Sequence, residues 1–312
     1  MNAPVSLDLK VWPTFTELVS DYFAQYAGRD TSRPHRLAWW VGKFGARPAI
    51  SITDDDVFIA MEELAAQVPR RYAGHDADGN KVFRAQAGKR APATLNRYLV
   101  ALAALFSWAI KRRRVPKHWE NPCKGIEKNA ESAGVVRFLS DDERARILVA
   151  CKESRWNRLY LLVLLAITTG ARRGELLSLR WADIDIGRAR AHICTTKNGE
   201  PKVLPLVPAV MEELQRFKCA PSALVFCSRL RPKSAFHFES SWKTALKTAK
   251  IQKFRFHDLR HTCASYLAQN GASLLEIADV MGHKQLAMTK RYAHLTVGSK
   301  ASLVNRVLGD IR

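Results

Sequence analysis

The 312-residue sequence lacks several features that mark common protein classes. Its six cysteines form no Cys-x-x-Cys pair and no zinc-binding spacing, which argues against a disulfide framework or a zinc module and predicts reduced thiols. The longest apolar run, residues 159–167, is well short of the ~20 residues of a membrane span, so we expect a core helix there and no membrane partner. No Gly-x-Ser-x-Gly turn occurs, which excludes that class of serine hydrolase.

Acidic residues are also scarce relative to basic ones. The 29 Asp and Glu stand against 50 Lys and Arg, which leaves a formal net charge of +21. The basic excess falls in residues 70–136 and again in residues 137–312, whereas residues 1–69 are slightly acidic. A field of this sign favours a polyanionic partner, most commonly nucleic acid. Two separate basic regions therefore predict two surfaces that hold one long anion.

Hydrophobic periodicity predicts a mainly α protein with a small antiparallel β-sheet, an α+β chain of two domains. The first domain, residues 1–124, is expected to be a helical bundle. Its helices are predicted at Phe15–Tyr26, Asp30–Phe44, Thr53–Gln67 and Pro92–Ile110. We interpret the acidic triplet that opens the third of these helices as helix capping, because adjacent helical carboxylates point apart and suit a metal poorly.

The second domain, residues 138–296, is expected to follow a Pro- and Gly-bearing linker at residues 125–137. A capping box at Ser140–Glu143 opens its first helix. Three short strands are predicted at residues 182–186, 190–196 and 202–206, followed by helices from Pro208 onward. An Asn-Gly pair at residues 198–199 predicts a tight hairpin turn between the last two strands.

Two basic stretches of the first domain are candidates for contact with DNA. Residues 70–90 are polar and Gly-bearing, which predicts an exposed loop or hairpin that either touches DNA or is a solvated insertion. The run at residues 111–114 ends a helix and suits phosphate contact better than simple solvation. With a second cationic stretch in the other domain, the DNA-contact candidates are Arg70, Arg71, Arg97, Lys111, Arg112, Arg113, Arg114, Lys243 and Lys247.

The last quarter of the chain contains side chains suited to phosphodiester chemistry. His257 and Arg260 are three residues apart in an expected helix, so they share a face and can address one ligand. His283 follows in a Met-Gly-His turn, and Tyr292 in an Arg-Tyr-Ala-His stretch. An Arg fork donates two hydrogen bonds to phosphate oxygens, imidazole titrates near neutrality and a phenol is a nucleophile. We therefore predict that Tyr292 attacks a phosphodiester held by the other three side chains.

Upstream residues supply the remaining parts of this scheme. Arg172 is a second guanidinium for the charge that develops on the phosphate oxygens. Glu175, three residues later, is placed to hold that guanidinium in position. Lys197, at the mouth of the expected hairpin, is a candidate general acid for the departing 5′ hydroxyl. With two arginines and a lysine neutralising the charge, the scheme requires no metal ion, cofactor or ATP.

At these residues the chain resembles the tyrosine recombinases, the group of phage integrases and Xer-type recombinases. It matches their Thr-Gly-x-Arg-x-x-Glu segment at residues 169–175, their hairpin lysine at Lys197, their His-x-x-Arg at residues 257–260, their Gly-His at residues 282–283 and their nucleophile at Tyr292. The matches occur in the family's order and at family-like gaps. The ordered set is far more specific than any one motif.

The resemblance implies a catalytic domain at residues 138–296 and a core-type DNA-binding domain at residues 1–124. It further implies a 3′-phosphotyrosine intermediate, strand exchange through a Holliday junction, and a homotetramer on specific DNA sites assembled from protomers that are monomeric in solution. The tail, residues 297–312, is expected to dock on a neighbouring protomer through an apolar stripe that includes Val304, Val307, Leu308 and Ile311. Packing of this stripe on its own domain is the alternative.

The resemblance also bears on regulation and location. The first expected helix starts close to Met1, so we expect no arm-binding domain and no arm-site control of direction. Accessory DNA-bending or directionality proteins are candidate partners. The expected location is the cytoplasm, at the nucleoid, because no secretory signal is evident.

Other interpretations fit parts of the pattern. A type IB topoisomerase shares the chemistry but acts as a monomer without pairing sites, and a DNA-binding protein that no longer cleaves would share only the fold. Tyr292 on its own would be interpreted as a packed aromatic residue. His257 and His261 have the i, i+4 spacing of metal ligands, but no carboxylate or cysteine stands at a matching offset.

Overall fold

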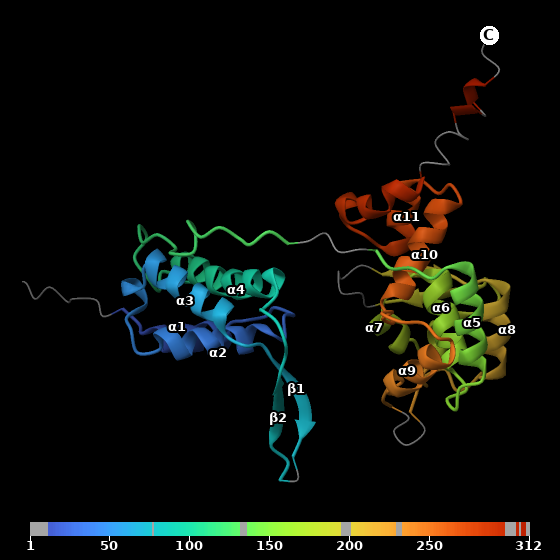
Figure 1. Ribbon diagram of the computed structural model, residues 1–312, viewed down its shortest axis with the longest axis horizontal. Coiled ribbons are helices and arrows are strands. Elements are labelled where there is room, and N and C mark those ends of the chain that lie inside the picture. The colour runs from blue at the N-terminus through green and yellow to red at the C-terminus, as the bar shows by residue number, and fades with distance from the viewer. Residues whose placement is uncertain are drawn as a thin grey trace, which may run out of the picture. The chain divides into compact units, whose positions relative to one another are not determined.

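The computed structural model describes residues 12–76, 78–131, 136–194, 201–228, 233–296, 304–305 and 307–309. The chain divides into two compact units, residues 1–133 and 134–312, each with its own apolar core (Figure 1). The division falls inside the segment that the sequence suggested as a linker. The predicted fold class, mainly α with a small antiparallel sheet, is confirmed.

In its described residues, the first unit is a bundle of four α-helices. They are α1 (Phe15–Ala24), α2 (Arg33–Phe44), α3 (Asp54–Ala66) and α4 (Pro92–Lys111), with a short 3-10 turn, η1 (Ala49–Ser51), before α3. Thr53 caps α3 in a capping box with Asp56, whose carboxylate also binds Arg47 at 2.7 Å between Nη2 and Oδ2. The acidic triplet therefore lies in the first turn of α3, where Asp56 completes the cap, in agreement with the capping role that the sequence predicted.

Helix α4 is the central helix of this bundle. Among the described residues it is the one helix long and apolar enough to cross a membrane, but half of its apolar window is buried inside the unit. Leu102, Leu105 and Phe106 are fully shielded from solvent and pack in the core with residues of α1, α2 and α3. We conclude that α4 is the core helix of the bundle.

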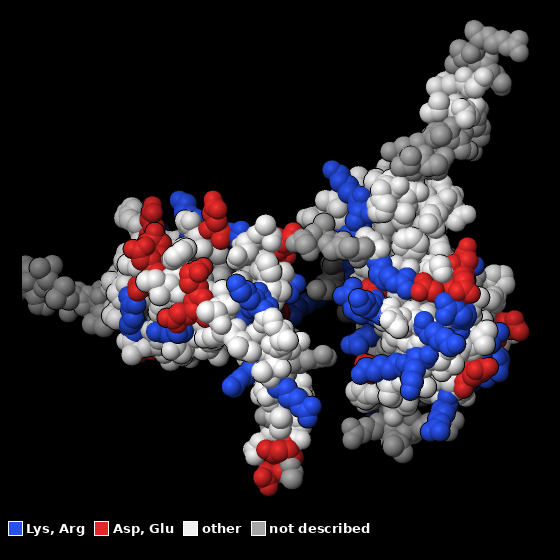
Figure 2. Space-filling model, viewed as in Figure 1, with Lys and Arg blue, Asp and Glu red and all other residues white. Residues whose placement is uncertain are grey.

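A β-hairpin projects from the bundle between α3 and α4 (Figure 1). Its strands are β1 (Arg70–His75) and β2 (Lys81–Ala85), which pair antiparallel with an irregularity between Tyr72 and Gly74. The hairpin alternative for residues 70–90 is therefore correct. Figure 2 shows Lys and Arg along its shaft and acidic side chains at its tip, where the sequence has Asp76 and Asp78.

The second unit contains seven helices in the described chain, with short 3-10 turns, and a three-stranded sheet whose buried residues belong to the same apolar core. The helices are α5 (Asp141–Lys152), α6 (Leu159–Thr169), α7 (Arg173–Leu177), α8 (Pro208–Arg216), α9 (Glu239–Thr248), α10 (Asp258–Gln269) and α11 (Leu274–Met281). The 3-10 turns are η2 (Trp181–Asp183), η3 (Leu286–Met288) and η4 (Lys290–Thr296). Helix α6 is apolar on almost every side and lies in the centre of the core, as its uninterrupted apolar run predicted.

The sheet has the order β3 (Ile184–Asp185), β4 (Arg190–Ile193), β5 (Lys202–Pro205), with both pairings antiparallel. Each strand is shorter than predicted from the sequence. The pairing of β4 with β5 agrees with the expected hairpin, while its Asn-Gly turn lies outside the described residues. The described tail residues Val304, Val307 and Leu308 are at least half exposed, and Ile311 lies outside the described residues.

Gly170 ends α6 in a left-handed conformation (φ +61°) that only glycine adopts without strain. A Cβ added here would lie 2.7 Å from Met281 Sδ and 3.3 Å from Cys263 Sγ. We expect Gly170→Ala to lower the free energy of unfolding by about 1–3 kcal/mol, measured by urea denaturation of the full chain. Gly174→Ala is the control, because a Cβ there meets nothing within 4 Å. Equal midpoints for the two variants would contradict the prediction.

Candidate active site

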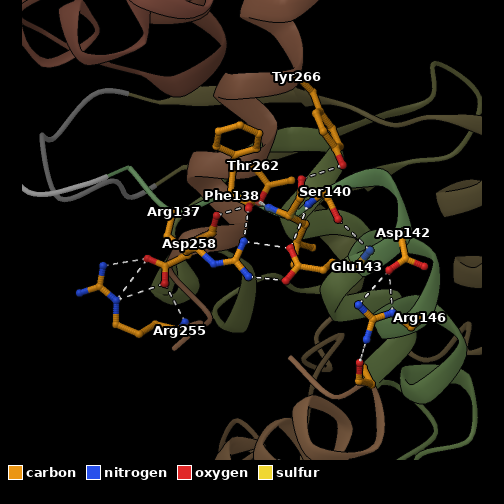
Figure 3. Close-up of polar contacts among 12 residues, drawn as sticks. Arg137, Phe138, Ser140, Asp142, Glu143, Arg146, Arg255, Asp258, Thr262 and Tyr266 are labelled. Atoms are coloured by element: carbon orange, nitrogen blue, oxygen red, sulfur yellow. Dashed lines mark hydrogen bonds and ion pairs between the residues drawn. The ribbon is translucent and has the colours of Figure 1, made fainter. Parts of the chain in front are cut away.

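Helix α10 and the residue before it carry three of the side chains that the site is built from, and the start of the helix is fixed by Asp258. The Asp258 carboxylate accepts a hydrogen bond from the backbone N–H of Arg255 (2.7 Å) and binds the Arg255 guanidinium (2.8 Å from Nη2 to Oδ1). These contacts close the turn that precedes the helix (Figure 3). His257, the residue before the helix, and Arg260 in its first turn are thereby set on one side of α10.

The segment that enters the second unit anchors the same helix. Thr262 accepts the backbone N–H of Leu139 at its Oγ1 (3.1 Å), and Tyr266 donates its hydroxyl to the Leu139 carbonyl (3.1 Å) (Figure 3). Arg137 binds Glu143, the capping residue of α5. The chain before α5 is therefore fastened to α10 by side chains on the helix that carries the candidate catalytic residues.

Arg172 lies at the start of the short helix α7, just after the Gly170 turn. Its Nη1 donates to Glu175 Oε1 (2.8 Å), and its backbone N–H donates to Glu175 Oε2 (2.9 Å). The Glu175 side chain is 4% exposed, whereas that of Arg172 is 23% exposed. Glu175 therefore holds the guanidinium from the buried side and leaves part of Arg172 open to a ligand. The contact between these two side chains, inferred from their spacing, is present.

Arg260 is a buried guanidinium, 5% exposed, held by two backbone carbonyls. Its Nη1 donates to the Gly170 carbonyl and its Nη2 to the Met281 carbonyl. Burial and the neighbouring Arg172 lower the pKa of Arg260 to about 10, so the group remains charged at neutral pH. Arg260 thus joins the turn that precedes Arg172 to the turn that precedes His283, and brings both arginines to one place.

The two histidines of the motif lie close to these arginines. Gly282 ends α11 in a left-handed conformation (φ +62°), which directs the chain into His283. Burial, Arg260 and Arg172 lower the pKa of His283 to about 4, and burial and Arg260 also lower the pKa of His257. His283 Nδ1 makes a hydrogen bond of 2.9 Å with Thr289 Oγ1. At neutral pH the imidazole of His283 is therefore neutral, and either histidine can offer a ring N–H to a phosphate oxygen.

Tyr292 lies in η4 and is 1% exposed. Its ring packs in a small apolar cluster with residues of α10 and α11. Its hydroxyl is 2.6 Å from Nδ1 of His261. Burial raises the pKa of Tyr292, while burial and the neighbouring His257 lower the pKa of His261 to about 4. The phenol therefore keeps its proton and donates it to the neutral His261 in this structure.

This contact changes the interpretation of His261. The sequence offered it only as a metal ligand paired with His257, whereas the structure commits its Nδ1 to Tyr292. Within the described segments, no three His, Cys, Asp or Glu side chains are grouped as a metal site would need. The sequence contained one indication that His261 belongs to the site, namely that it directly follows Arg260.

The depressed histidine pKa values predict acid sensitivity of the native state. His261 and His283 have folded pKa values of about 4, below the ordinary histidine value of 6.5, so protonation favours the unfolded chain. The stability from these groups is complete above pH 6.5 and is lost as the pH falls toward 4. We expect the urea midpoint of the full chain to fall across this window, and to fall less steeply in His283→Gln. His237→Gln, at an exposed position, serves as the control, and an unchanged slope in His283→Gln would contradict the prediction.

Lys197, the predicted general acid, lies outside the described residues. Sequence reasoning missed a second lysine, Lys202, which begins β5 and lies beside Arg172 and Arg260. The pattern held a signal for it, because side chains two apart in a strand share a face. Leu204 and Leu206, on the same face as Lys202, are buried. A lysine on the same strand face as buried leucines is expected to point toward the interior of the unit.

The DNA-contact candidates are mostly exposed. Arg70 and Arg97 are exposed on β1 and α4, and Lys111, Arg112 and Arg113 are exposed at the end of α4. Arg71 is in β1, opposite Arg84. Arg114 is engaged in an ion pair with Asp21, so its guanidinium has a partner within the first unit. Lys243 and Lys247 are exposed one turn apart on α9, where they share a face.

Comparison with known proteins agrees with this geometry. The family model described as the phage integrase family matches residues 137–298. A shufflon-specific DNA recombinase of Escherichia coli is 34% identical over 176 residues, which cover 56% of this chain and 44% of that protein. The integrase of Salmonella phage P22 is 27% identical over 285 residues, 83% of this chain and 70% of that integrase.

Solved structures share the fold. A Tn1549 transposon integrase in complex with transposon right end DNA covers 95% of this chain and 99% of its own, with a TM-score of 0.70 and 16% identity. A lambda integrase dimer bound to a core site covers 90% and 95%, with a TM-score of 0.64 and 18% identity. At these identities the likeness concerns the fold.

Proposed function

Because the chain belongs to the phage integrase family, we propose that it is a tyrosine-type, site-specific DNA recombinase. The observation that carries the proposal is the convergence of Arg172, His257, Arg260 and His283 beside the buried Tyr292. These side chains come from four separate stretches of the chain, and together they match what phosphoryl transfer to a tyrosine requires. The related recombinases and integrases support the same activity, and they do not favour the topoisomerase alternative.

In the proposed reaction, the Tyr292 oxygen attacks the scissile phosphorus while its proton passes to the neutral imidazole of one of the two motif histidines. A phosphorus–oxygen bond forms to the phenol while the bond to the 5′ oxygen breaks, which leaves a 3′-phosphotyrosine. Arg172 and Arg260 stabilise the charge on the non-bridging oxygens, and the two motif histidines donate to the same oxygens. Lys197 gives its proton to the departing 5′ oxygen. Because the covalent bond conserves the energy of the phosphodiester, a second 5′ hydroxyl can reverse the step on another strand.

Tyr292 must lose two constraints before it reacts. Its hydroxyl donates a hydrogen bond to His261, and its ring is buried in the apolar cluster of the second unit. A phenol with a raised pKa is a poor nucleophile, so the proposal includes a rearrangement of η4 when DNA binds. The arginines then neutralise the phosphate as the phenol approaches.

The assembly on DNA is also part of the proposal. We propose that the protein is monomeric in solution and forms a homotetramer on two specific double-stranded sites, with exchange through a Holliday junction. The solved lambda integrase is a dimer on a core site. The tail supports contact between protomers, because Val304, Val307 and Leu308 are exposed. We also propose that accessory DNA-bending or directionality proteins are partners, and that the protein is located in the cytoplasm at the nucleoid.

The function is tested with purified protein and nicked duplexes tiled across the DNA that flanks its own gene. Products are separated on denaturing gels beside those of Tyr292→Phe. We expect a covalent adduct on the 3′ phosphate of one discrete fragment, absent from the variant. Adducts on every fragment would favour a topoisomerase. A footprint on one fragment without any adduct would favour a protein that binds and does not cleave.

A further inference from the structure

A pocket of the second unit contains a lysine that the recombination scheme does not use. The pocket has a volume of about 460 Å³, and Arg172, Lys202, Gly282 and His283 are among the residues that line it. Lys202 lies across Gly282, since a Cβ added to that glycine would be 3.5 Å from Lys202 Cδ and 4.0 Å from its Nζ. This glycine directly precedes His283. The ammonium group of Lys202 is therefore close to the backbone of the second motif histidine.

Among the described residues, the Lys202 ammonium has no hydrogen-bonding partner that accounts for its position. Its Nζ is shielded from solvent and makes no hydrogen bond with any described residue. Glu175 attracts it, but both Glu175 oxygens are already bonded to Arg172. Asp279 also lines the pocket, yet it is exposed and the Lys202 Nζ makes no hydrogen bond with it. A buried cation without a partner costs free energy that a bound anion would offset.

The charged groups around Lys202 also indicate that an anion binds in this pocket. Lys202 and Arg172 line the same pocket, and burial, Arg260 and Arg172 lower the pKa of Lys202 to about 8. Three cations therefore lie near one another in this part of the unit. Groups of like charge repel unless an anion lies between them. A phosphodiester with its developing negative charge meets that need, because its non-bridging oxygens accept hydrogen bonds from several donors at once.

We propose that Lys202 donates to a non-bridging oxygen of the scissile phosphate, as a third cation beside Arg172 and Arg260. This inference rests on the proposed function, and it assigns Lys202 a role distinct from that of Lys197. Lys197 gives a proton to the leaving 5′ oxygen, whereas Lys202 keeps its proton throughout the step. Lys202 contacts the substrate charge that forms in the transition state, so its effect falls on the rate of cleavage more than on DNA affinity.

The test is single-turnover cleavage of the nicked duplex on which the wild type forms its adduct. Lys202→Met keeps the length of the side chain without its charge, and Lys202→Arg keeps a charge. We expect Lys202→Met to cleave on the order of 100-fold more slowly at nearly unchanged affinity, and Lys202→Arg to recover most of that loss. Lys152→Met is the matched control, because Lys152 is an exposed lysine of the same unit whose Nζ lies 4.7 Å from the Tyr160 ring centroid.

A second substrate separates the two lysine roles. A sulfur in place of the 5′ bridging oxygen is a better leaving group and needs no general acid, so it should rescue Lys197→Ala and leave the deficit of Lys202→Met unchanged. Rescue of Lys202→Met would make Lys202 the general acid and overturn the assignment. Cleavage by Lys202→Met at the wild-type rate would also overturn the assignment. A Lys202→Arg variant as slow as Lys202→Met would overturn it as well, because it would indicate that Lys202 has a packing role.

Two further results keep the outcomes distinct. If the wild type forms no adduct on any duplex, the proposed function fails before Lys202 is tested. If Lys202→Met has a urea midpoint below that of the wild type, Lys202→Gln, a smaller polar replacement, takes its place. The same rate criteria then apply to Lys202→Gln, and wild-type cleavage by it would overturn the assignment.

Discussion

Tyr292→Phe is expected to abolish the covalent protein–DNA adduct completely while DNA affinity stays at the wild-type level. The substitution removes the only oxygen of this side chain and leaves its ring in the apolar cluster of α10 and α11. It also removes the hydrogen bond to His261, so the free energy of unfolding should fall by about 1 kcal/mol. Denaturing gels measure the adduct, gel-shift titration the affinity, and urea denaturation the stability.

Tyr266→Phe is the matched control for this prediction. Tyr266 belongs to the same helix, α10, as His261, and its hydroxyl donates one hydrogen bond, to the Leu139 carbonyl at 3.1 Å. Both variants therefore lose a hydroxyl that donates a hydrogen bond, but only Tyr292→Phe loses the candidate nucleophile. We expect Tyr266→Phe to form the adduct. If Tyr292→Phe still formed the adduct, another residue would be the nucleophile.

The second large effect is expected from the two arginines. Arg172→Ala and Arg260→Lys should each slow cleavage by about 10²–10³-fold, because each weakens the stabilisation of charge on the phosphate oxygens. Lysine cannot replace Arg260, since its single ammonium cannot bind the carbonyls of Gly170 and Met281 together and still present a donor to a ligand. Single-turnover cleavage rates and DNA affinities, measured side by side, check the prediction.

Arg173→Ala provides the comparison for Arg172→Ala. Arg173 is the next residue in the chain, is more than half exposed, and binds Glu239 at 3.0 Å. Its loss removes the same charge from nearly the same place but leaves the site intact, so cleavage should change little. If Arg172→Ala and Arg260→Lys lose affinity as much as rate, the two side chains hold DNA in the ground state and do not act on the transition state.

Local pattern was sufficient to predict most helices of this protein. The capping boxes of α3 and α5 and the uninterrupted apolar run of α6 are short-range features, and each element forms where these features predicted it. The strands β3 to β5 were predicted too long, because the length of a strand depends on where its neighbours stop pairing. The hairpin of residues 70–90 was left open between two forms for the same reason.

For the candidate site, too, the sequence predicted the contacts within one helix or turn but not the contacts between distant segments. Spacing within one helix or one turn placed Arg172 against Glu175, and His257 and Arg260 on one side of α10, since these relations are fixed by 3.6 residues per turn. Arg260 bridging Gly170 and Met281, and His261 bonded to Tyr292, join segments at least 21 residues apart. No local pattern contains such pairs.

The sequence by itself determined the fold class, the positions of most helices and the identity of the residues that match the family. Those properties follow from hydrophobic periodicity, capping and an ordered set of motifs, all of which are written along the chain. The tertiary structure alone decided that Tyr292 is buried against His261, that Arg114 pairs with Asp21 and that Lys202 lines one pocket with Arg172. Burial and charge proximity arise only when distant segments pack together, and they set which donors remain for a phosphate.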